Sequence, residues 1–306
     1  MARLILVVNA GSTSLKLSLV DGGESRPVES YDVAADAVAH RIVHGGERFR
    51  EPVVIDDAVL AELEQLVELA PLHNAPALRA LADARRALPD VPHVAVFDTA
   101  FHATLPPVAS TYAVPAGLGL RRYGFHGLAV QSVAERVRVP RLVVCHLGGG
   151  CSVTAVLDGR SVETSMGFTP LEGVPMATRS GSVDPGGVLH VARRLGVDEL
   201  ERVLEEESGL TALSGFSGDV RELERDPRGD FALEVLAYRV AQAAAACAVA
   251  LGGLDAVAFS GGIGEHSSRV RGDVVARLAF LAPFEVRVVA AREDAVAARA
   301  ARELLA

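Results

Sequence analysis

Two glycine-centred hairpin patterns constrain the fold of this chain most. Residues Leu142–Gly159 read L-V-V-C-H-L-G-G-G-C-S-V-T-A-V-L-D-G, and residues Leu6–Gly22 read L-V-V-N-A-G-S-T-S-L-K-L-S-L-V-D-G. Each pattern predicts an apolar strand, a glycine turn, a returning strand and a D-G turn. One offset aligns Gly148 with Gly11 without a gap. A single hairpin would be ordinary, but the matched pair predicts two related domains facing a common cleft, with a polyphosphate held by the backbone N–H groups of both turns.

Composition narrows the class of protein. The chain has 306 residues, 50% of them hydrophobic, which is enough for two cored domains. The net charge of −9 argues against nucleic acid as a partner. Cys145, Cys151 and Cys247 form neither a disulfide framework nor a metal-binding spacing, and we expect Cys145 and Cys247 to be buried thiols. With no signal peptide and no apolar run of membrane-spanning length, the sequence predicts a soluble cytoplasmic protein.

The scarcity of two residue types draws attention to the first glycine turn. Lys16 is the only lysine of the chain, and Asn9 and Asn74 are the only asparagines. Lys16 and Asn9 flank that turn, where a compact ammonium differs physically from a planar guanidinium. Chance retention is the alternative explanation.

In the first half, the patterns predict a β-meander, a further strand, two helices and another strand. The predicted ranges are Leu4–Val8, Leu15–Val20, Glu29–Val33, Ala37–Gly46, Asp56–Leu69, Ala75–Ala87 and Val94–Phe97. Arg41 interrupts an apolar strand, which is costly unless the cation is paired or meets an anion, although it could instead snorkel from an edge. Asn74 is a candidate N-cap. His93 is interpreted as a loop residue, and packing is the favoured role of His44.

Asp98 and His126 are the clearest candidates for a site in this half. Asp98 follows a strand, where α/β proteins place ligand-binding residues, although it could merely cap the next turn. His126 and Gly127 precede a predicted helix over Leu128–Val137, so the imidazole could point into a cleft or simply pack there.

In the second half, Met166–Pro185 is a long loop rich in proline and glycine, and its apolar content favours function over disorder. Arg179 in this loop is either a site cation or a solvated one. Predicted elements then follow in order: helices over Gly187–Leu195 and Val197–Glu207, a loop over Ser208–Arg221, a turn over Asp226–Asp230, a helix over Phe231–Leu251, a strand over Ala256–Ser260 and a helix over Glu293–Leu305. The strand runs into Gly261-Gly262-Ile263-Gly264, a weak signal for nucleotide binding.

Eight motifs together resemble the acetate kinase family. They are N-A-G-S-T-S-L-K, H-R-I-V-H-G-G-E, P-L-H-N, F-D-T-A-F-H, R-R-Y-G-F-H-G, C-H-L-G-G-G-C-S, S-M-G-F-T-P-L-E-G and F-S-G-G-I-G-E, in the family's order over nearly the whole chain. The resemblance implies an α/β fold of two duplicated actin-like ATPase (ribonuclease H-like) domains around a nucleotide cleft. Residues 1–98 with 293–306 would form the first domain, and residues 99–292 the second, with the nucleoside pocket and a homodimer interface.

The resemblance also implies a reversible, in-line transfer of the ATP γ-phosphoryl group to acetate, with ADP and acetyl phosphate as products and Mg²⁺ or Mn²⁺ as the metal. By resemblance, the catalytic residues are Arg41, His73, Asp98, His126, Arg179 and Glu293. Asn9, Asp98 and Glu293 are the metal residues. Arg41, Val43, Leu72, Phe125 and Pro170 line the acyl pocket. Asn9, Ser12, Ser14, Lys16, His146, Gly148, Gly149, Gly150, Asp219, Val220, Arg221, Gly261, Gly262, Ile263 and Gly264 bind the nucleotide.

Three departures from the family pattern keep alternatives open. Gly149 stands where acetate kinases usually have Asn, which is closer to butyrate kinases, and Arg292 replaces a usual Asn. The chain is also shorter, with losses between Val20 and His40 and between Gly264 and Arg292. A propionate or butyrate kinase is therefore the enzymatic alternative, with propionate a further substrate, and a nucleotide-binding paralogue with little or no turnover is the alternative of another class.

Overall fold

The computed structural model describes residues 4–11, 15–69 and 71–306, with the main chain alone at residues 68, 69 and 71–73. It divides into two compact units. Unit 1 holds residues 1–103, 125–132 and 292–306, and unit 2 holds residues 104–124 and 133–291. Ser12 and Ser14 of the predicted phosphate site lie outside the described residues.

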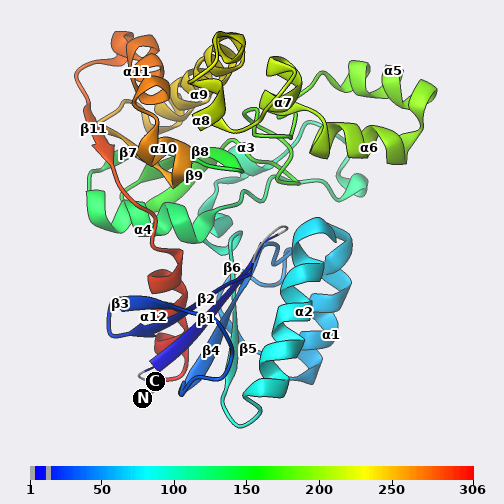
Figure 1. Ribbon diagram of the computed structural model, residues 1–306, viewed down its shortest axis with the longest axis vertical. Coiled ribbons are helices and arrows are strands. Elements are labelled where there is room, and N and C mark those ends of the chain that lie inside the picture. The colour runs from blue at the N-terminus through cyan, green and yellow to red at the C-terminus, as the bar shows by residue number, and fades with distance from the viewer. Residues whose placement is uncertain (1–3, 12–14, 70) are drawn as a thin grey trace. The chain divides into compact units, whose positions relative to one another are not determined.

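Unit 1 is built on a six-stranded sheet in the order β3-β2-β1-β4-β6-β5 (Figure 1). The strands are β1 (Leu4–Ala10), β2 (Leu15–Asp21), β3 (Glu24–Val28), β4 (Ala37–Ile42), β5 (Val53–Val54) and β6 (His93–Phe97). The helices are α1 (Asp57–Gln65), η1 (Leu66–Leu69), α2 (Pro71–Ala87), η2 (Ala100–Thr104), the first part of α4 (Gly127–Val137) and α12 (Glu293–Leu304). Strand β1 pairs antiparallel with β2 and parallel with β4, which pairs parallel with β6.

Both faces of the parallel strands β1, β4 and β6 are buried, as is usual where parallel strands are covered by helices. Leu6 and Val8 of β1 pack with Leu81 and Ala84 of α2 on one face. On the other face, Ile5 and Val7 belong to a cluster with Val296, Ala297, Ala298 and Ala301 of α12. The apolar positions of the C-terminal helix therefore complete the core of unit 1.

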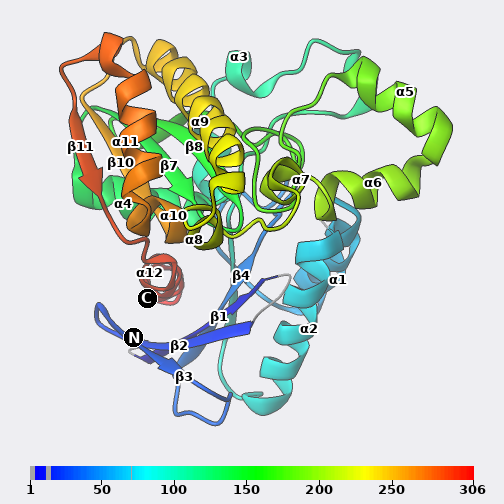
Figure 2. The ribbon, with the colours of Figure 1, turned by 45° about the horizontal axis from the view of Figure 1, so that its top comes forward.

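Unit 2 contains a five-stranded sheet in the order β11-β10-β7-β8-β9 (Figure 2). Its strands are β7 (Arg141–Leu147), β8 (Cys151–Leu157), β9 (Arg160–Thr164), β10 (Ala256–Ser260) and β11 (Glu285–Val288). Its helices are α3 (Pro107–Ser110), η3 (Ala116–Leu118), the second part of α4, α5 (Pro185–Leu195), α6 (Val197–Glu206), α7 (Gly209–Ser214), α8 (Val220–Leu223), η4 (Pro227–Gly229), α9 (Asp230–Leu251), α10 (Gly261–His266), α11 (Ser268–Arg277) and η5 (Ala279–Leu281).

The two sheets repeat one topology, as the matched hairpins predicted. In unit 1, β2 and β3 follow β1 on one side and β4 and β6 lie on the other. In unit 2, β8 and β9 follow β7 in the same way, and β10 and β11 lie on the other side. Helix α9 packs on this sheet; with η4 it is long and apolar enough to cross a membrane, but half of that apolar window is buried inside the protein, as in a core helix.

Five expectations about elements were wrong. The third strand is Glu24–Val28 rather than Glu29–Val33, because Gly22 and Gly23 allow an immediate turn. Helix α2 begins at Pro71, which suits the first turn of a helix. Asn74 is consequently inside α2 and is no N-cap, and His93 belongs to β6. The stretch Ser208–Arg221 contains the short helices α7 and α8, where we expected a loop.

Candidate active site

A buried ion pair forms the centre of the candidate site in unit 1. Arg41 lies in β4 and Asp98 directly follows the neighbouring strand β6. The Nε of Arg41 donates to both carboxylate oxygens of Asp98 at 3.1 Å, and Nη2 makes a closer contact with Oδ2. The side chains are 14% and 1% exposed, respectively. Arg41 therefore does not extend its charge to solvent, because the guanidinium is paired with the buried carboxylate of Asp98.

Asn9 and Glu293 join this pair. Asn9 of β1 is the register partner of Arg41 in the parallel β1–β4 ladder, and its Oδ1 accepts from Arg41 Nη1 at 2.9 Å. Its Nδ2 donates to Oε2 of Glu293, the first residue of α12, also at 2.9 Å. The fold thus gathers four predicted site residues, two of which are carboxylates, from three strands or strand ends and one helix start.

Charge and burial oppose each other in this cluster. Burial lowers the pKa of the Arg41 guanidinium, but the carboxylates of Asp98 and Glu293 outweigh it and raise that pKa. Burial raises the pKa of Asp98, with Arg41 opposing and Glu293 adding to the rise. Two carboxylates beside a single guanidinium leave an excess of negative charge, which favours a further cation.

His126 approaches this cluster through its main chain. Its φ of +60° is in the left-handed region, and its amide N–H contributes a hydrogen bond to the Asp98 carboxylate that lowers the pKa of Asp98. The amide of Gly127 donates to the Asp98 carbonyl at 3.0 Å. A Cβ at Gly127 would lie 2.1 Å from that carbonyl oxygen, so only glycine fits. The sequence pattern G-F-H-G placed Gly127 at the start of a helix but did not indicate this close approach to the Asp98 carbonyl.

The predicted acyl-pocket residues belong to both units. Val43 and Phe125 are buried in unit 1, and the His44 ring contacts Phe125 edge-on with centroids 5.4 Å apart. Leu72 and His73 lie in the first turn of α2, where the structure describes the main chain alone. Pro170 is buried in unit 2.

Asn74 has a role that the sequence did not reveal. Its Oδ1 accepts from the His44 amide at 3.1 Å, and its Nδ2 donates to the carbonyls of His44 and Leu66 at 3.2 Å. It therefore ties α2 to the segment after β4. The scarcity of asparagine was a signal for it, since Asn74 is one of two in the chain.

Lys16 lies in β2, opposite Asn9 in the antiparallel register, and is exposed. The compact ammonium is therefore available to an anion beside the first glycine turn.

Unit 2 contains a cavity of about 600 Å³ that collects most of its predicted nucleotide residues. Gly148, Gly149, Asp219, Val220, Arg221, Gly262 and Ile263 line it, together with Ala177, Thr178, Thr211, Gly218, Glu224, His266 and Ser267, which the sequence did not indicate. A second cavity, of about 610 Å³, lies elsewhere in unit 2 and is lined by none of the predicted site residues.

The glycines at this cavity fall into two groups. Gly148 donates to the Gly150 carbonyl at 3.0 Å, and nothing lies within 4 Å of a Cβ built at Gly149, so the turn is open to a ligand. Gly261 has a φ of +76°, and a Cβ there would be 2.5 Å from the Leu147 carbonyl oxygen. Gly264 is buried against Phe259. Gly150, Gly261 and Gly264 do not line the cavity, and Gly261 lets the first residue of α10 lie close to the end of β7.

Of two pairs of predicted or neighbouring polar residues, one lines the cavity and the other does not. Asp219 caps α8 and accepts from Arg221 through the amide at 2.9 Å and through Nε at 3.0 Å, and the hydrogen bonds from the Arg221 side chain lower the pKa of Asp219. His146 in β7 shares a hydrogen bond with Ser260 Oγ at 3.0 Å through Nδ1. His146 does not line the cavity.

Arg179 is 16% exposed and held on two sides. Its Nη1 donates to the Pro170 carbonyl at 3.1 Å, and its Nε lies 3.5 Å from Oε2 of Glu205 in α6. Burial raises the pKa of the Cys151 thiol to about 11, and the positive charge of Arg179 acts against that rise. The guanidinium thus lies within electrostatic reach of the glycine turn, since Cys151 Sγ contacts the Gly148 carbonyl at 3.4 Å.

The donor set in unit 1 fits a hard divalent cation. Mg²⁺ takes oxygen ligands and commonly uses one or two carboxylates, with water and phosphate oxygens completing its shell. Asp98, Glu293 and the Asn9 amide supply that chemistry. Among the described residues there is no cluster of three or more His, Cys, Asp or Glu side chains that would make a closed metal cage.

Comparison with known proteins identifies the family. The model of the acetokinase family matches residues 24–298. The chain belongs to the acetokinase family. It is 42% identical to the acetate kinase of Oceanobacillus iheyensis over 288 residues, which is 88% of this chain and 72% of that protein.

Solved structures of the family agree. The propionate kinase of Francisella tularensis has a TM-score of 0.88 at 31% identity, with 97% of this chain and 98% of that chain covered. The acetate kinase of Porphyromonas gingivalis also has a TM-score of 0.88, at 29% identity, with 99% and 100% covered. A ROK family protein from Streptococcus pneumoniae shares the fold alone, with 10% identity and a TM-score of 0.51 over 99% of each chain. These matches confirm the predicted family, the ATPase-type α/β fold and the carboxyl-acceptor kinase class, and membership of an acetokinase family implies ATP use.

Proposed function

We propose that this protein transfers the γ-phosphoryl group of ATP to acetate, giving ADP and acetyl phosphate, and catalyses the reverse reaction. The observation that carries the proposal is the buried cluster of Arg41, Asn9, Asp98 and Glu293. The chain is also 42% and 48% identical to two acetate kinases. Phosphoryl transfer depends mainly on positioning and on positive charge around the transferred group, and this cluster and Arg179 are suited to supplying both.

In this proposal, unit 2 binds the nucleotide and unit 1 binds the metal. In unit 2, the cavity beside Gly148 and Gly149 takes the nucleotide, with the nucleoside at Asp219 and Arg221. In unit 1, Asp98, Glu293 and Asn9 would hold Mg²⁺, or Mn²⁺ in its place. When bound, the metal would neutralise charge on the phosphate oxygens. Lys16 contributes a point charge to the polyphosphate.

The protein's own groups would orient the reaction. Arg41 binds the substrate carboxylate, and Arg179 meets the equatorial oxygens of the transferring phosphoryl group, in each case through charge-assisted N–H donation. His126 donates to the same group, and its left-handed backbone fixes the direction of its side chain. No covalent enzyme intermediate is required, because the carboxylate oxygen itself attacks phosphorus in line.

Acetate is the preferred acid in this proposal. Val43 and Phe125 are fully apolar and buried, and the β-branched Val43 is stiff at χ1, which leaves little room beyond a methyl group. One methylene is worth only about 1–3 kcal/mol in such a pocket, so propionate should remain a slower substrate. The likeness to a propionate kinase structure supports propionate as the alternative.

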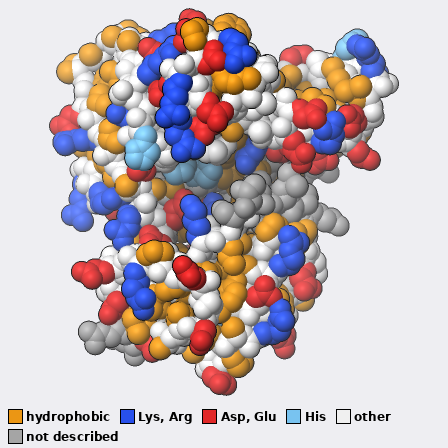
Figure 3. Space-filling view, viewed as in Figure 1, with side chains coloured by type: hydrophobic (Ala, Val, Ile, Leu, Met, Phe, Trp, Pro, Cys, Tyr) orange, Lys and Arg blue, Asp and Glu red, His pale blue; other side chains and the backbone are white. Residues whose placement is uncertain are grey.

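We also propose a cytoplasmic homodimer formed through unit 2. Helix α5 contains no buried residue. Leu189 of α5 and Val197, the first residue of α6, are 58% and 72% exposed. Orange side chains appear among the charged ones over the α5–α6 region at the upper right of Figure 3. An apolar helix face of this kind is typical of an interface. Light scattering should give a dimer mass, and Leu189→Glu should lower it if α5 takes part.

The test of substrate choice is kcat/KM for acetate, propionate and butyrate, measured as acyl hydroxamate with MgATP. We expect the order acetate, propionate, butyrate, and Val43→Ala should raise the relative value for propionate. A preference for butyrate would instead support the interpretation of Gly149 as a butyrate-kinase feature. ATP binding without acyl phosphate from any acid would favour the paralogue with little or no turnover.

A further inference from the structure

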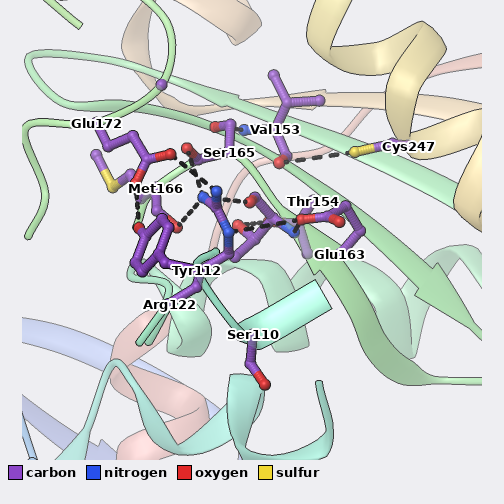
Figure 4. Close-up of polar contacts among 12 residues, drawn as sticks. Ser110, Tyr112, Arg122, Val153, Thr154, Glu163, Ser165, Met166, Glu172 and Cys247 are labelled. Atoms are coloured by element: carbon purple, nitrogen blue, oxygen red, sulfur yellow. Dashed lines mark hydrogen bonds and ion pairs between the residues drawn. The ribbon is translucent and has the colours of Figure 1, made fainter. Parts of the chain in front are cut away.

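The loop that carries Pro170 is held by a half-buried polar network. Arg122, 17% exposed, donates through Nη1 to the carbonyls of Thr164, Ser165 and Met166 at 3.1, 3.2 and 3.1 Å. Its Nη2 donates to Oε1 of Glu172 at 2.8 Å. Figure 4 shows the Arg122 guanidinium surrounded by these oxygens. A single cation therefore fixes both ends of the segment from residue 166 to residue 172.

Tyr112 closes the network on the other side. Its hydroxyl donates to Oε2 of Glu172 (Figure 4) and accepts from the amide of Phe168 at 3.0 Å. Burial first, and then the Glu172 carboxylate, raise the pKa of Tyr112 to about 12, so the hydroxyl stays a donor at neutral pH. Both oxygens of Glu172 thus have a donor, one from Arg122 and one from Tyr112.

Gly167 lies inside this ring of contacts. A Cβ built there would be 1.6 Å from Glu172 Oε2 and 2.1 Å from the Tyr112 hydroxyl. Its carbonyl accepts from the amide of Tyr123 at 3.0 Å. The residue must be glycine because the network occupies the space of a side chain. This accounts for Gly167 and Glu172 in the S-M-G-F-T-P-L-E-G motif.

The segment contacts the candidate catalytic arginine through Pro170. The Pro170 carbonyl accepts from Nη1 of Arg179 at 3.1 Å, so any displacement of the segment moves an acceptor that orients this guanidinium. No residue between 166 and 172 lines the nucleotide cavity of unit 2. The network can therefore affect Arg179 without altering the walls of that cavity.

We propose that Tyr112, Arg122 and Glu172 are positioning residues, which hold the segment of residues 166–172 so that the Pro170 carbonyl aims Arg179 at its anion. None of the three needs to touch the substrate. The inference rests on the proposed role of Arg179 in phosphoryl transfer.

The first test is Tyr112→Phe, which removes a single hydroxyl, with Tyr238→Phe on the exposed face of α9 as the matched control. We expect kcat for acetyl phosphate formation to fall about tenfold or more, as a small misplacement of a catalytic group does, with KM for ATP unchanged. The control should retain wild-type kcat. Glu172→Gln, which keeps shape but removes the charge, should lower kcat in the same way.

A double-mutant cycle separates positioning from a general loss of folding. In an Arg179→Ala background, Tyr112→Phe should have almost no further effect on kcat. A full tenfold loss in that background, or a wild-type kcat for Tyr112→Phe, would overturn the inference.

A second readout needs no turnover and therefore distinguishes this inference from the proposed function. Inorganic phosphate binding, measured by calorimetry, should weaken in Tyr112→Phe and in Arg179→Ala, and the two changes should not add. If the wild type formed no acyl phosphate, the proposed function would fail, and phosphate binding would still decide the positioning role. Equal phosphate affinity in the wild type and Tyr112→Phe would refute it.

Discussion

Replacing Arg41 by Gln should make the protein dependent on a divalent cation for stability. In the described structure the guanidinium is the counter-ion of Asp98, which is 1% exposed, and it also binds Asn9. Removing one partner of a buried ion pair costs about 3–5 kcal/mol. For a protein of this size that corresponds to a fall in Tm of about 10 °C.

A divalent cation should reverse much of that loss. With the guanidinium gone, Asp98 loses its paired cation and the Asn9 amide oxygen loses its donor, so a metal would meet these oxygens without competition from Arg41. Mn²⁺ should therefore bind Arg41→Gln about tenfold more tightly than it binds the wild type, a difference of about 1.4 kcal/mol. The rise in Tm on adding metal should also be larger in the variant, because a ligand stabilises the folded state in proportion to RT ln(1 + [L]/Kd).

The assay is thermal unfolding with and without Mg²⁺, together with Mn²⁺ titration followed by electron paramagnetic resonance. Arg48→Gln is the matched control, since Arg48 is an exposed arginine of unit 1 whose side chain is paired with Glu62. The reasoning would be refuted by a variant that bound Mn²⁺ more weakly than the wild type, or by equal metal-dependent shifts in Tm.

Three further predictions concern single side chains. Arg179→Ala should lower kcat by 100-fold or more, since a lost donor of this kind costs about 3 kcal/mol, while circular dichroism shows an intact fold; near-wild-type turnover would contradict its role. Lys16→Arg should raise KM for ATP despite keeping the charge, and silence in steady-state kinetics would mean that Lys16 was retained by chance. Burial lowers the pKa of His40 to about 3, so the unfolded chain takes up the proton first and acid destabilises the fold below about pH 6.5. His40 should account for about 2 kcal/mol of lost unfolding free energy between pH 7 and pH 5, and His40→Gln, with His190→Gln of exposed α5 as control, should flatten that slope.

Much of the fold could be predicted because strands and turns are indicated by residues that are adjacent in the sequence. The strand from Leu142 and its D-G turn appeared where expected, since β-branched apolar runs and glycine turns need no distant partner to be interpreted. The start of α2 was misplaced because Pro71 and Asn74 are ambiguous in isolation. Only the buried contact of Asn74 with His44 decides that it faces inward rather than capping a helix.

The candidate site divides in the same way. Arg41 and Asp98 stood out because a cation within an apolar strand and a carboxylate after a strand are visible in sequence, and the structure pairs them. Tyr112 and Glu205 gave no such signal. Tyr112 contacts a residue 60 positions away, and Glu205 of α6 meets Arg179 of a distant loop, so long-range packing alone gives them a role.

The most direct test of the central proposal is ³¹P nuclear magnetic resonance of the protein with MgATP and acetate. The proposal predicts an acyl phosphate resonance that grows in step with ADP and requires acetate. Release of inorganic phosphate at the same rate with and without acetate, or ATP left unconsumed, would contradict it.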